Sequence, residues 1–207
     1  MTPFIRTHAW LLALAVIASF VMLFRLGAQP IQDWDEGIHG QVSFEMAESG
    51  DWLTPHYMGG PYFRKPPLKL WMTAGLFALL PTPSNSPSRW EGEKLIAWGL
   101  RLPSALAGIA TALLIGWWVW QWRGSRLEAL LAGVIIATMR PIFSHAFRTG
   151  EMDGMLTLCT TAALYCWWRA ASITSSFRGH SEESHTEVPA RHDVRSLARA
   201  RDDDRRG

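Results

Sequence analysis

The sequence predicts an all-α membrane protein with about four transmembrane helices and a long outer loop that carries interfacial helices. Three observations predict this fold class. Apolar segments of about the length that crosses a bilayer recur along residues 1–171. The 12 tryptophans cluster near the ends of these segments, as in the aromatic belt of a membrane interface. Charge is sparse before Trp168 and dense after it, while the formal net charge of +2 gives no indication of nucleic-acid binding.

The predicted membrane spans are residues 9–28, 97–122, 127–145 and 154–171. The first span contains one charged residue, Arg25, which can reach the headgroups from near the end of the helix. A cleaved signal peptide is the alternative, but the apolar run is long for one. The second span is rich in small residues near its start, which favours close helix contact in lipid. In the third span Arg140 precedes Pro141, so a kink or break is expected there.

The predicted outer loop covers residues 29–95. Asp33 as N-cap and Glu36 in the capping-box position predict a helix that ends at Ser49 and Gly50. One apolar stripe on that helix suggests that it lies in the membrane interface; the stripe is formed by Ile38, Val42 and Met46. Paired prolines then predict a second interfacial helix over 68–80, followed by a turn region over 81–88.

Short-loop arginines predict the orientation, because cytoplasmic loops are enriched in positive charge. Arg123 and Arg126 in a tight turn, and Arg169 after the last span, are therefore expected on the cytoplasmic side. The outer loop and the turn over 147–154 then share the outer, non-cytoplasmic side of the membrane. Residues 172–207 have few large apolar side chains and are predicted to form a disordered charged tail.

Three carboxylates are candidates for catalysis. Asp35 and Glu36 are adjacent at a predicted helix start, where the helix dipole favours their charged forms, and a charged carboxylate in a partly dry site can act as a general base. Asp153 lies at the mouth of the fourth span on the same predicted side. The alternative is structural: Asp35 and Glu36 would cap one helix, and Asp153 would cap another.

A cluster of basic residues is the candidate phosphate site. Lys65 and Arg64 follow the aromatic residue Tyr62, and their side chains suit a phosphate group. Ordinary attraction to anionic headgroups is the alternative. Arg101, at the outer mouth of the second span, is expected to assist. The histidines have no metal-ligand spacing, so a metal site has no support from the sequence.

Four short motifs, in the same order, resemble the amino-terminal part of the membrane glycosyltransferases that use polyprenyl-phosphate sugars. The similarity is greatest to the bacterial aminoarabinose transferase and protein O-mannosyltransferase group of the GT-C superfamily, glycosyltransferase family 39, and covers about residues 9–170. The motifs are DEGIHGQV (35–42), ESGDWLTP (48–55), GPYFRKPPL (60–68) and RLPSALAG (101–108).

The resemblance assigns roles to residues that match the family's motifs. It implies that Asp35 and Glu36 lie at the reaction centre and that Asp153 is the family's second acidic residue. The Tyr-Phe-x-Lys-Pro-Pro motif begins at Tyr62, and it implies that Lys65 contacts the lipid phosphate. Arg64 stands where the family commonly has an acidic residue.

The resemblance implies a glycosyltransferase that moves a sugar from a polyprenyl-phosphate donor to a protein, lipid A or another glycan on the outer face of the membrane. Its partners would be the lipid-linked sugar and membrane lipids, with no cofactor required. Family members carry many more spans. The alternative is therefore a catalytically inactive, truncated fragment or a lipid-phosphate-binding membrane module. A small transporter is a third interpretation, disfavoured because the spans carry almost no polar residues at mid-membrane.

Overall fold

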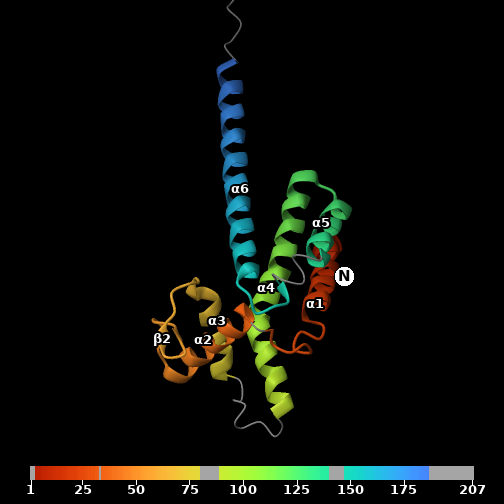
Figure 1. The fold of residues 1–207 in the computed structure, drawn as a ribbon. Coiled ribbons are helices and arrows are strands. Elements are labelled where there is room, and N and C mark those ends of the chain that lie inside the picture. The colour runs from red at the N-terminus through yellow and green to blue at the C-terminus, as the bar shows by residue number, and fades with distance from the viewer. Residues whose placement is uncertain (1–2, 33, 80–88, 140–146, 187–207) are drawn as a thin grey trace, which may run out of the picture. The chain divides into compact units, whose positions relative to one another are not determined.

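The computed structural model describes residues 3–32, 34–79, 89–139 and 147–186. These segments are mostly helical (Figure 1). In chain order the elements are α1 (Pro3–Leu23), α2 (Asp35–Ser49), β1 (His56–Tyr57), β2 (Gly60–Pro61), α3 (Pro67–Leu79), α4 (Arg89–Arg123), α5 (Arg126–Thr138) and α6 (Asp153–Thr186). The chain divides into two compact units, Met1–Tyr165 and Cys166–Gly207. The candidate site lies in the first unit.

Helices α1, α4 and α5 pack together through small side chains (Figure 1). Ala18 of α1, Ala112 of α4 and Ala137 of α5 are fully buried in one cluster. A Cβ atom added at Gly133 would lie 2.4 Å from Leu14 Cδ2 and 3.0 Å from the carbonyl oxygen of Ala112, so α5 lies close to both α1 and α4 at this glycine. Ala105 and Ala112, two small residues of the predicted second span, are fully buried in this cluster, and their role in helix contact within lipid stays a prediction.

Helices α2 and α3 form a second packed group together with the β1–β2 hairpin (Figure 1). Val42 and Met46 of α2 are buried against Leu70 and Ala74 of α3. The apolar stripe of α2 was predicted to face the membrane interface, and this is corrected: the stripe faces α3. Packing against the apolar face of α3 removes the stripe from water, as insertion into the membrane interface would have done, so the hydrophobic effect favours this contact.

The hairpin has the two-residue turn that its twist requires. His56 pairs with Pro61 and Tyr57 pairs with Gly60 in antiparallel register. The two turn residues, Met58 and Gly59, both have positive φ, at 52° and 79°. Such a turn matches the right-handed twist of the flanking strands.

One helix in the described part of the chain is long and apolar enough to cross a membrane, namely the stretch Lys94–Arg123 of α4. Two shorter apolar helices, His8–Leu23 and Pro67–Leu79, accompany it. The number of about four spans therefore stays a prediction.

Two predicted spans end earlier than expected. The first was placed over 9–28, but α1 ends at Leu23 and hydrogen-bonded turns follow it. The third was placed over 127–145, but α5 ends at Thr138 and Met139 is extended, at φ −62° and ψ 115°. Pro141 has no N–H to donate to the carbonyl of Ala137, which explains why the helix stops there. The expected kink at Arg140 lies outside the described residues.

Two other helix ends differ from the prediction, namely the start of α2 and the end of α6. Trp34, not Asp33, precedes α2 and makes no side-chain cap; Asp33 itself lies outside the described residues. Gly50 ends α2 in the left-handed conformation, as predicted. Helix α6 continues to Thr186, so residues 172–186 of the predicted disordered tail are helical. Adding turns to an existing helix needs no new nucleation. Residues 187–207, and the predicted turn region over 81–88, lie outside the described residues.

Candidate functional site

Asp35 and Lys65 form an ion pair between the starts of two helices. Asp35 is the first residue of α2, and Lys65 precedes α3, whose first residue is Pro67. Lys65 Nζ donates to Asp35 Oδ2 across 3.3 Å. Both side chains are more than one-third exposed, at 36% for Lys65 and 38% for Asp35. Such an exposed pair contributes little to stability, so either partner can engage a ligand at small cost.

A cavity of about 280 Å³ opens beside this pair, between the start of α3 and the first turns of α6. Lys65 lies on its wall, and so does Asp153, the exposed first residue of α6. Most of the remaining wall is apolar, with Leu68, Met155 and Leu156 among its members. Lys65 therefore connects Asp35 to a partly dry cavity that also exposes Asp153. Charges interact more strongly in such surroundings than in open water.

Glu36, the neighbour of Asp35, points into the protein instead. Its side chain is 1% exposed, and its carboxylate accepts from Arg101 at both oxygens, across 2.7 and 2.9 Å. The backbone N–H groups of Gln32 and Gly150 also donate to it, across 2.8 and 2.7 Å. Burial alone would raise the pKa of Glu36, but the hydrogen bonds from Arg101 and the backbone outweigh burial and lower it. Glu36 is a fully satisfied carboxylate.

Arg101 uses its remaining donors to hold the segment between α1 and α2. Its Nη1 donates to the carbonyl oxygens of Leu26 and Gln29, across 3.0 and 2.9 Å. Its Nη2 donates to the carbonyl oxygen of Pro30 across 2.8 Å. One buried guanidinium thus joins α4, the connection before α2, and α2 itself.

The peptide of Gly150 is held at both of its polar atoms. Its N–H donates to Glu36, while its carbonyl oxygen accepts from Lys69 Nζ and lies 3.1 Å from His39 Nδ1. A Cβ atom at position 150 would lie 2.6 Å from Leu100 Cγ, so a side chain has no room there. Because Gly150 is three residues before Asp153, this grip fixes the start of α6 at the cavity.

Two of these contacts come from buried titratable groups. Lys69 is 1% exposed, and burial lowers its pKa from 10.5 to about 7, although attraction to Glu36 and Glu151 opposes the shift. Burial and the nearby positive charge of Lys69 also lower the pKa of His39. His39 is therefore neutral at pH 7, and a neutral ring that carries its proton on Nδ1 can donate to the carbonyl of Gly150.

Residues 12–182 match the sequence model of the family described as dolichyl-phosphate-mannose-protein mannosyltransferase. The chain belongs to this family.

Its curated relatives include bacterial proteins named undecaprenyl phosphate-alpha-4-amino-4-deoxy-L-arabinose arabinosyl transferase. The protein from Aeromonas hydrophila is 28% identical over 171 residues, which cover 81% of this chain and 29% of the relative. The protein from Pseudomonas savastanoi pv. phaseolicola is 32% identical over 169 residues, covering 75% and 27%. This chain thus spans less than a third of the length of these relatives. The comparison with solved structures gave no match.

The structure of this mannosyltransferase-family chain separates the predicted site residues into two groups. Asp35, Lys65 and Asp153 are brought to the cavity or to its edge. The other four do not line it. Glu36 and Arg101 form the internal pair described above, Arg64 is exposed elsewhere, and Tyr62 is buried in the core between α2 and α3. Burial raises the pKa of the Tyr62 hydroxyl.

Sequence reasoning missed Lys69, His39 and Gly150. Lys69 had a signal: it is a cation within an apolar helix, four residues after Lys65 and so on a similar face. Gly150 and His39 had none, because the contact between them joins segments 111 residues apart. Among the described residues, no group of three or more His, Cys, Asp or Glu side chains is placed to hold a metal ion.

Proposed function

We propose that this chain is a glycosyltransferase that moves a sugar from a polyprenyl-phosphate donor to an acceptor at the non-cytoplasmic face of a bacterial inner membrane. One observation carries the proposal: Lys65 pairs with Asp35 and also lines the cavity that exposes Asp153. In this proposal Lys65 is the cation for the donor phosphate, and it lies next to a carboxylate that can take a proton. Family membership supports the same chemistry.

In the proposed reaction Asp35 removes a proton from the acceptor hydroxyl as its oxygen attacks the first carbon of the sugar. The bond between that carbon and the phosphate oxygen breaks, and the lipid phosphate leaves with the bonding electrons. Lys65 stabilises the charge that develops on the phosphate. Asp153, across the cavity, positions the acceptor or shares the role of base. Glu36 and Arg101 act as positioning residues, because they fix α2 and the turn before α6.

The relatives' printed names suggest the first donor to examine, an undecaprenyl-phosphate-linked aminoarabinose. The orientation is proposed from the positive-inside rule: Arg123 and Arg126 flank the short turn between α4 and α5, which would face the cytoplasm. Multiple membrane passes are part of the same proposal. Lipid A, a protein or another glycan is the proposed acceptor class.

Replacing Asp35 with Asn tests the proposed base. The full chain, in membranes, is supplied with radiolabelled undecaprenyl-phosphate sugar, and transfer to endogenous acceptor is measured. Asp35→Asn keeps the size of the side chain but removes the proton acceptor, so transfer is expected to fall by about 10²–10⁴-fold. Glu48→Gln is the matched control, because it neutralises an exposed carboxylate at the other end of α2.

The control is expected to retain wild-type transfer. Full transfer by Asp35→Asn would refute the role of the base. A wild-type chain that binds the labelled donor but releases no sugar would instead be a lipid-phosphate-binding module. Loss of that binding in Lys65→Met would then locate the module at this same cavity.

A further inference from the structure

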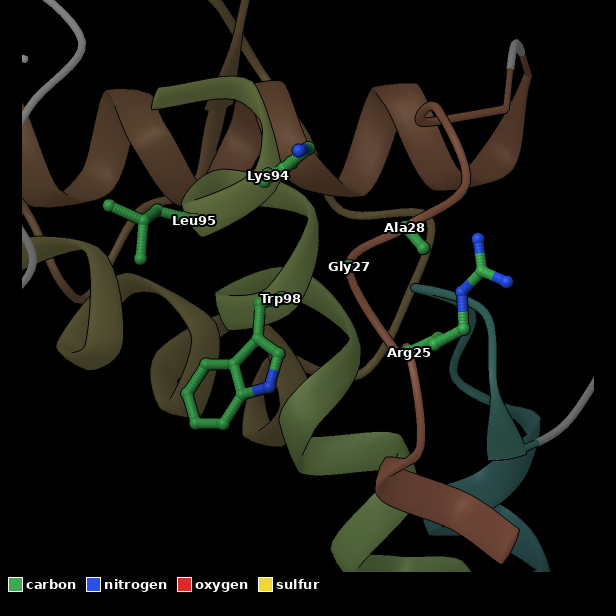
Figure 2. A pocket seen from close by; sticks show the side chains of 6 residues that line it. All are labelled: Arg25, Gly27, Ala28, Lys94, Leu95 and Trp98. Carbon is green, nitrogen blue, oxygen red and sulfur yellow. The ribbon is translucent and has the colours of Figure 1, made fainter. Parts of the chain in front are cut away.

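A second cavity, of about 430 Å³, lies apart from the candidate active site, between the turn after α1 and the first described turns of α4. Figure 2 shows Arg25 on that turn, and Lys94 and Trp98 on the neighbouring helix. The cavity shares no lining residue with the one between α3 and α6. Among the residues that the structure describes, its lining is Arg25, Gly27, Ala28, Lys94, Leu95 and Trp98.

The turn that forms one wall is held rigidly from its inner side. Arg148 donates to the carbonyl oxygens of Val21 and Phe24, across 2.8 and 2.7 Å. Arg101 donates to the carbonyl of Leu26 across 3.0 Å, and to the carbonyls of Gln29 and Pro30 across 2.9 and 2.8 Å. The turn also approaches α4 closely, since a Cβ atom at Gly27 would lie 2.7 Å from the carbonyl oxygen of Lys94. The wall is therefore preorganised.

Arg25 has a strained backbone, and its charge has no partner within the part of the chain that the structure describes. Its φ of 54° lies in the left-handed region, which costs a non-glycine residue about 1 kcal/mol or more. The exposed guanidinium makes no hydrogen bond or ion pair with any residue in the described ranges. The buried Arg101 and the partly buried Arg148 already donate to carbonyls on both sides of Arg25, so the Arg25 cation faces outward without serving these hydrogen bonds.

The cavity lies at the polar ends of two apolar helices. Arg25 follows the apolar stretch His8–Leu23, and Lys94 opens the candidate span Lys94–Arg123. Beside these cations, Phe24 is 54% exposed, Leu95 37% and Trp98 38%. Cations above an apolar, tryptophan-bearing surface form the pattern of a bilayer interface, and basic pockets between membrane helices bind anionic headgroups.

We propose that this cavity binds the phosphate-bearing headgroup of an anionic phospholipid, with Arg25 and Lys94 as the cationic contacts and Trp98 at the boundary with the acyl chains. The site holds a structural lipid against the start of α4. It does not depend on the proposed glycosyltransferase activity, because it shares none of that cavity's residues.

Native mass spectrometry of the full chain in a neutral detergent tests the site. The protein is titrated with phosphatidylglycerol and, separately, with phosphatidylcholine of the same acyl chains. Wild type is expected to bind one phosphatidylglycerol more tightly than phosphatidylcholine. Arg25→Asn and Lys94→Gln are each expected to weaken the binding of phosphatidylglycerol roughly fivefold, the effect of about 1 kcal/mol per cation near a membrane surface. Asparagine is chosen at position 25 because it tolerates the left-handed backbone.

Arg126→Gln is the matched control, since it removes the same charge from an exposed position beyond the other end of α4. Its affinity for phosphatidylglycerol is expected to equal that of wild type. The proposal is overturned if Arg25→Asn and Lys94→Gln leave the affinity unchanged, or if Arg126→Gln lowers it equally. Displacement of the lipid by millimolar inorganic phosphate would also overturn it, because the cavity would then take free phosphate. If a variant does not fold, equal wild-type affinities for the two lipids would still refute the proposal.

Discussion

Lys69 is a buried amine beside the start of α6, and its ammonium donates to the carbonyl of Gly150. A charge without solvent is costly, and the attraction of Glu36 and Glu151 offsets only part of that cost, so the pKa falls to about 7. The residue that fixes the Gly150 peptide therefore changes charge near neutral pH. This property makes the stability of the chain depend on pH in a defined direction.

The unfolding free energy of the wild-type chain is expected to rise with pH above about 7. Between that value and the ordinary pKa of 10.5, the folded chain has released the Lys69 proton while the unfolded chain retains it, so raising the pH favours folding. The slope from this group is at most about 1.4 kcal/mol per pH unit. Denaturant unfolding in detergent at pH 7 and pH 9 measures it.

Lys69→Met should remove this slope, whereas Lys94→Gln, at an exposed lysine, should keep it. The difference in stability between Lys69→Met and wild type should thus vary with pH. Parallel stability profiles for wild type and Lys69→Met would contradict the assignment of the buried amine.

At the level of elements, the pair between Glu36 and Arg101 joins α2 to α4, and Arg101 also holds the connection that follows α1. Both side chains are almost fully buried, with Arg101 3% and Glu36 1% exposed. Removing one partner of such a pair leaves the other charge buried without compensation. The pair therefore determines how three segments of the fold stay together.

Arg101→Met is expected to destabilise the chain by about 3–5 kcal/mol, because the Glu36 carboxylate loses its counter-charge inside the protein. Thermal unfolding in detergent measures the loss. Arg123→Met is the control: its partner Glu128 lies 2.8 Å away, but both side chains are exposed, so little change is expected. Equal effects from the two substitutions would show that the internal pair has no special weight.

Elements governed by neighbouring residues could be predicted from the sequence, and those governed by distant residues could not. Gly50 ended α2 and Pro67 opened α3 as expected, because capping and proline geometry act locally. The site divides in the same way. The sequence indicated Asp35 and Lys65, but it could not show that Glu36 turns inward, because its partner Arg101 is 65 residues away.

For the whole molecule, the orientation in the membrane is the property that the proposed function most requires. The outer loop that carries Asp35 and Lys65 must be on one side, and the turn between α4 and α5 on the other. Two leucines offer matched probes: Leu53, in the loop, is 85% exposed and Leu127, in α5, is 66% exposed.

Single cysteines at these positions, in a chain whose two native cysteines are replaced by serine, report the orientation. Leu53→Cys is expected to react with a membrane-impermeant maleimide in spheroplasts. Leu127→Cys is expected to react only after the membrane is disrupted. The reverse pattern would place the loop on the wrong side for the proposed reaction. Labelling of both cysteines in spheroplasts would contradict the cytoplasmic placement of the turn between α4 and α5.

The Gly150 peptide is hydrogen-bonded at both its N–H and its carbonyl, and this has a consequence for how the chain can be redesigned. Four positions meet at that one amide: Glu36 at its N–H, His39 and Lys69 at its carbonyl, and the glycine itself. A directed-evolution library that randomises these four positions together should return combined substitutions more often than single ones. The reason is that a change at one position leaves a buried polar group without its hydrogen-bond partner. A new acceptor preference would then be easier to engineer by substituting the apolar residues that line the cavity than by substituting the four residues around the Gly150 peptide.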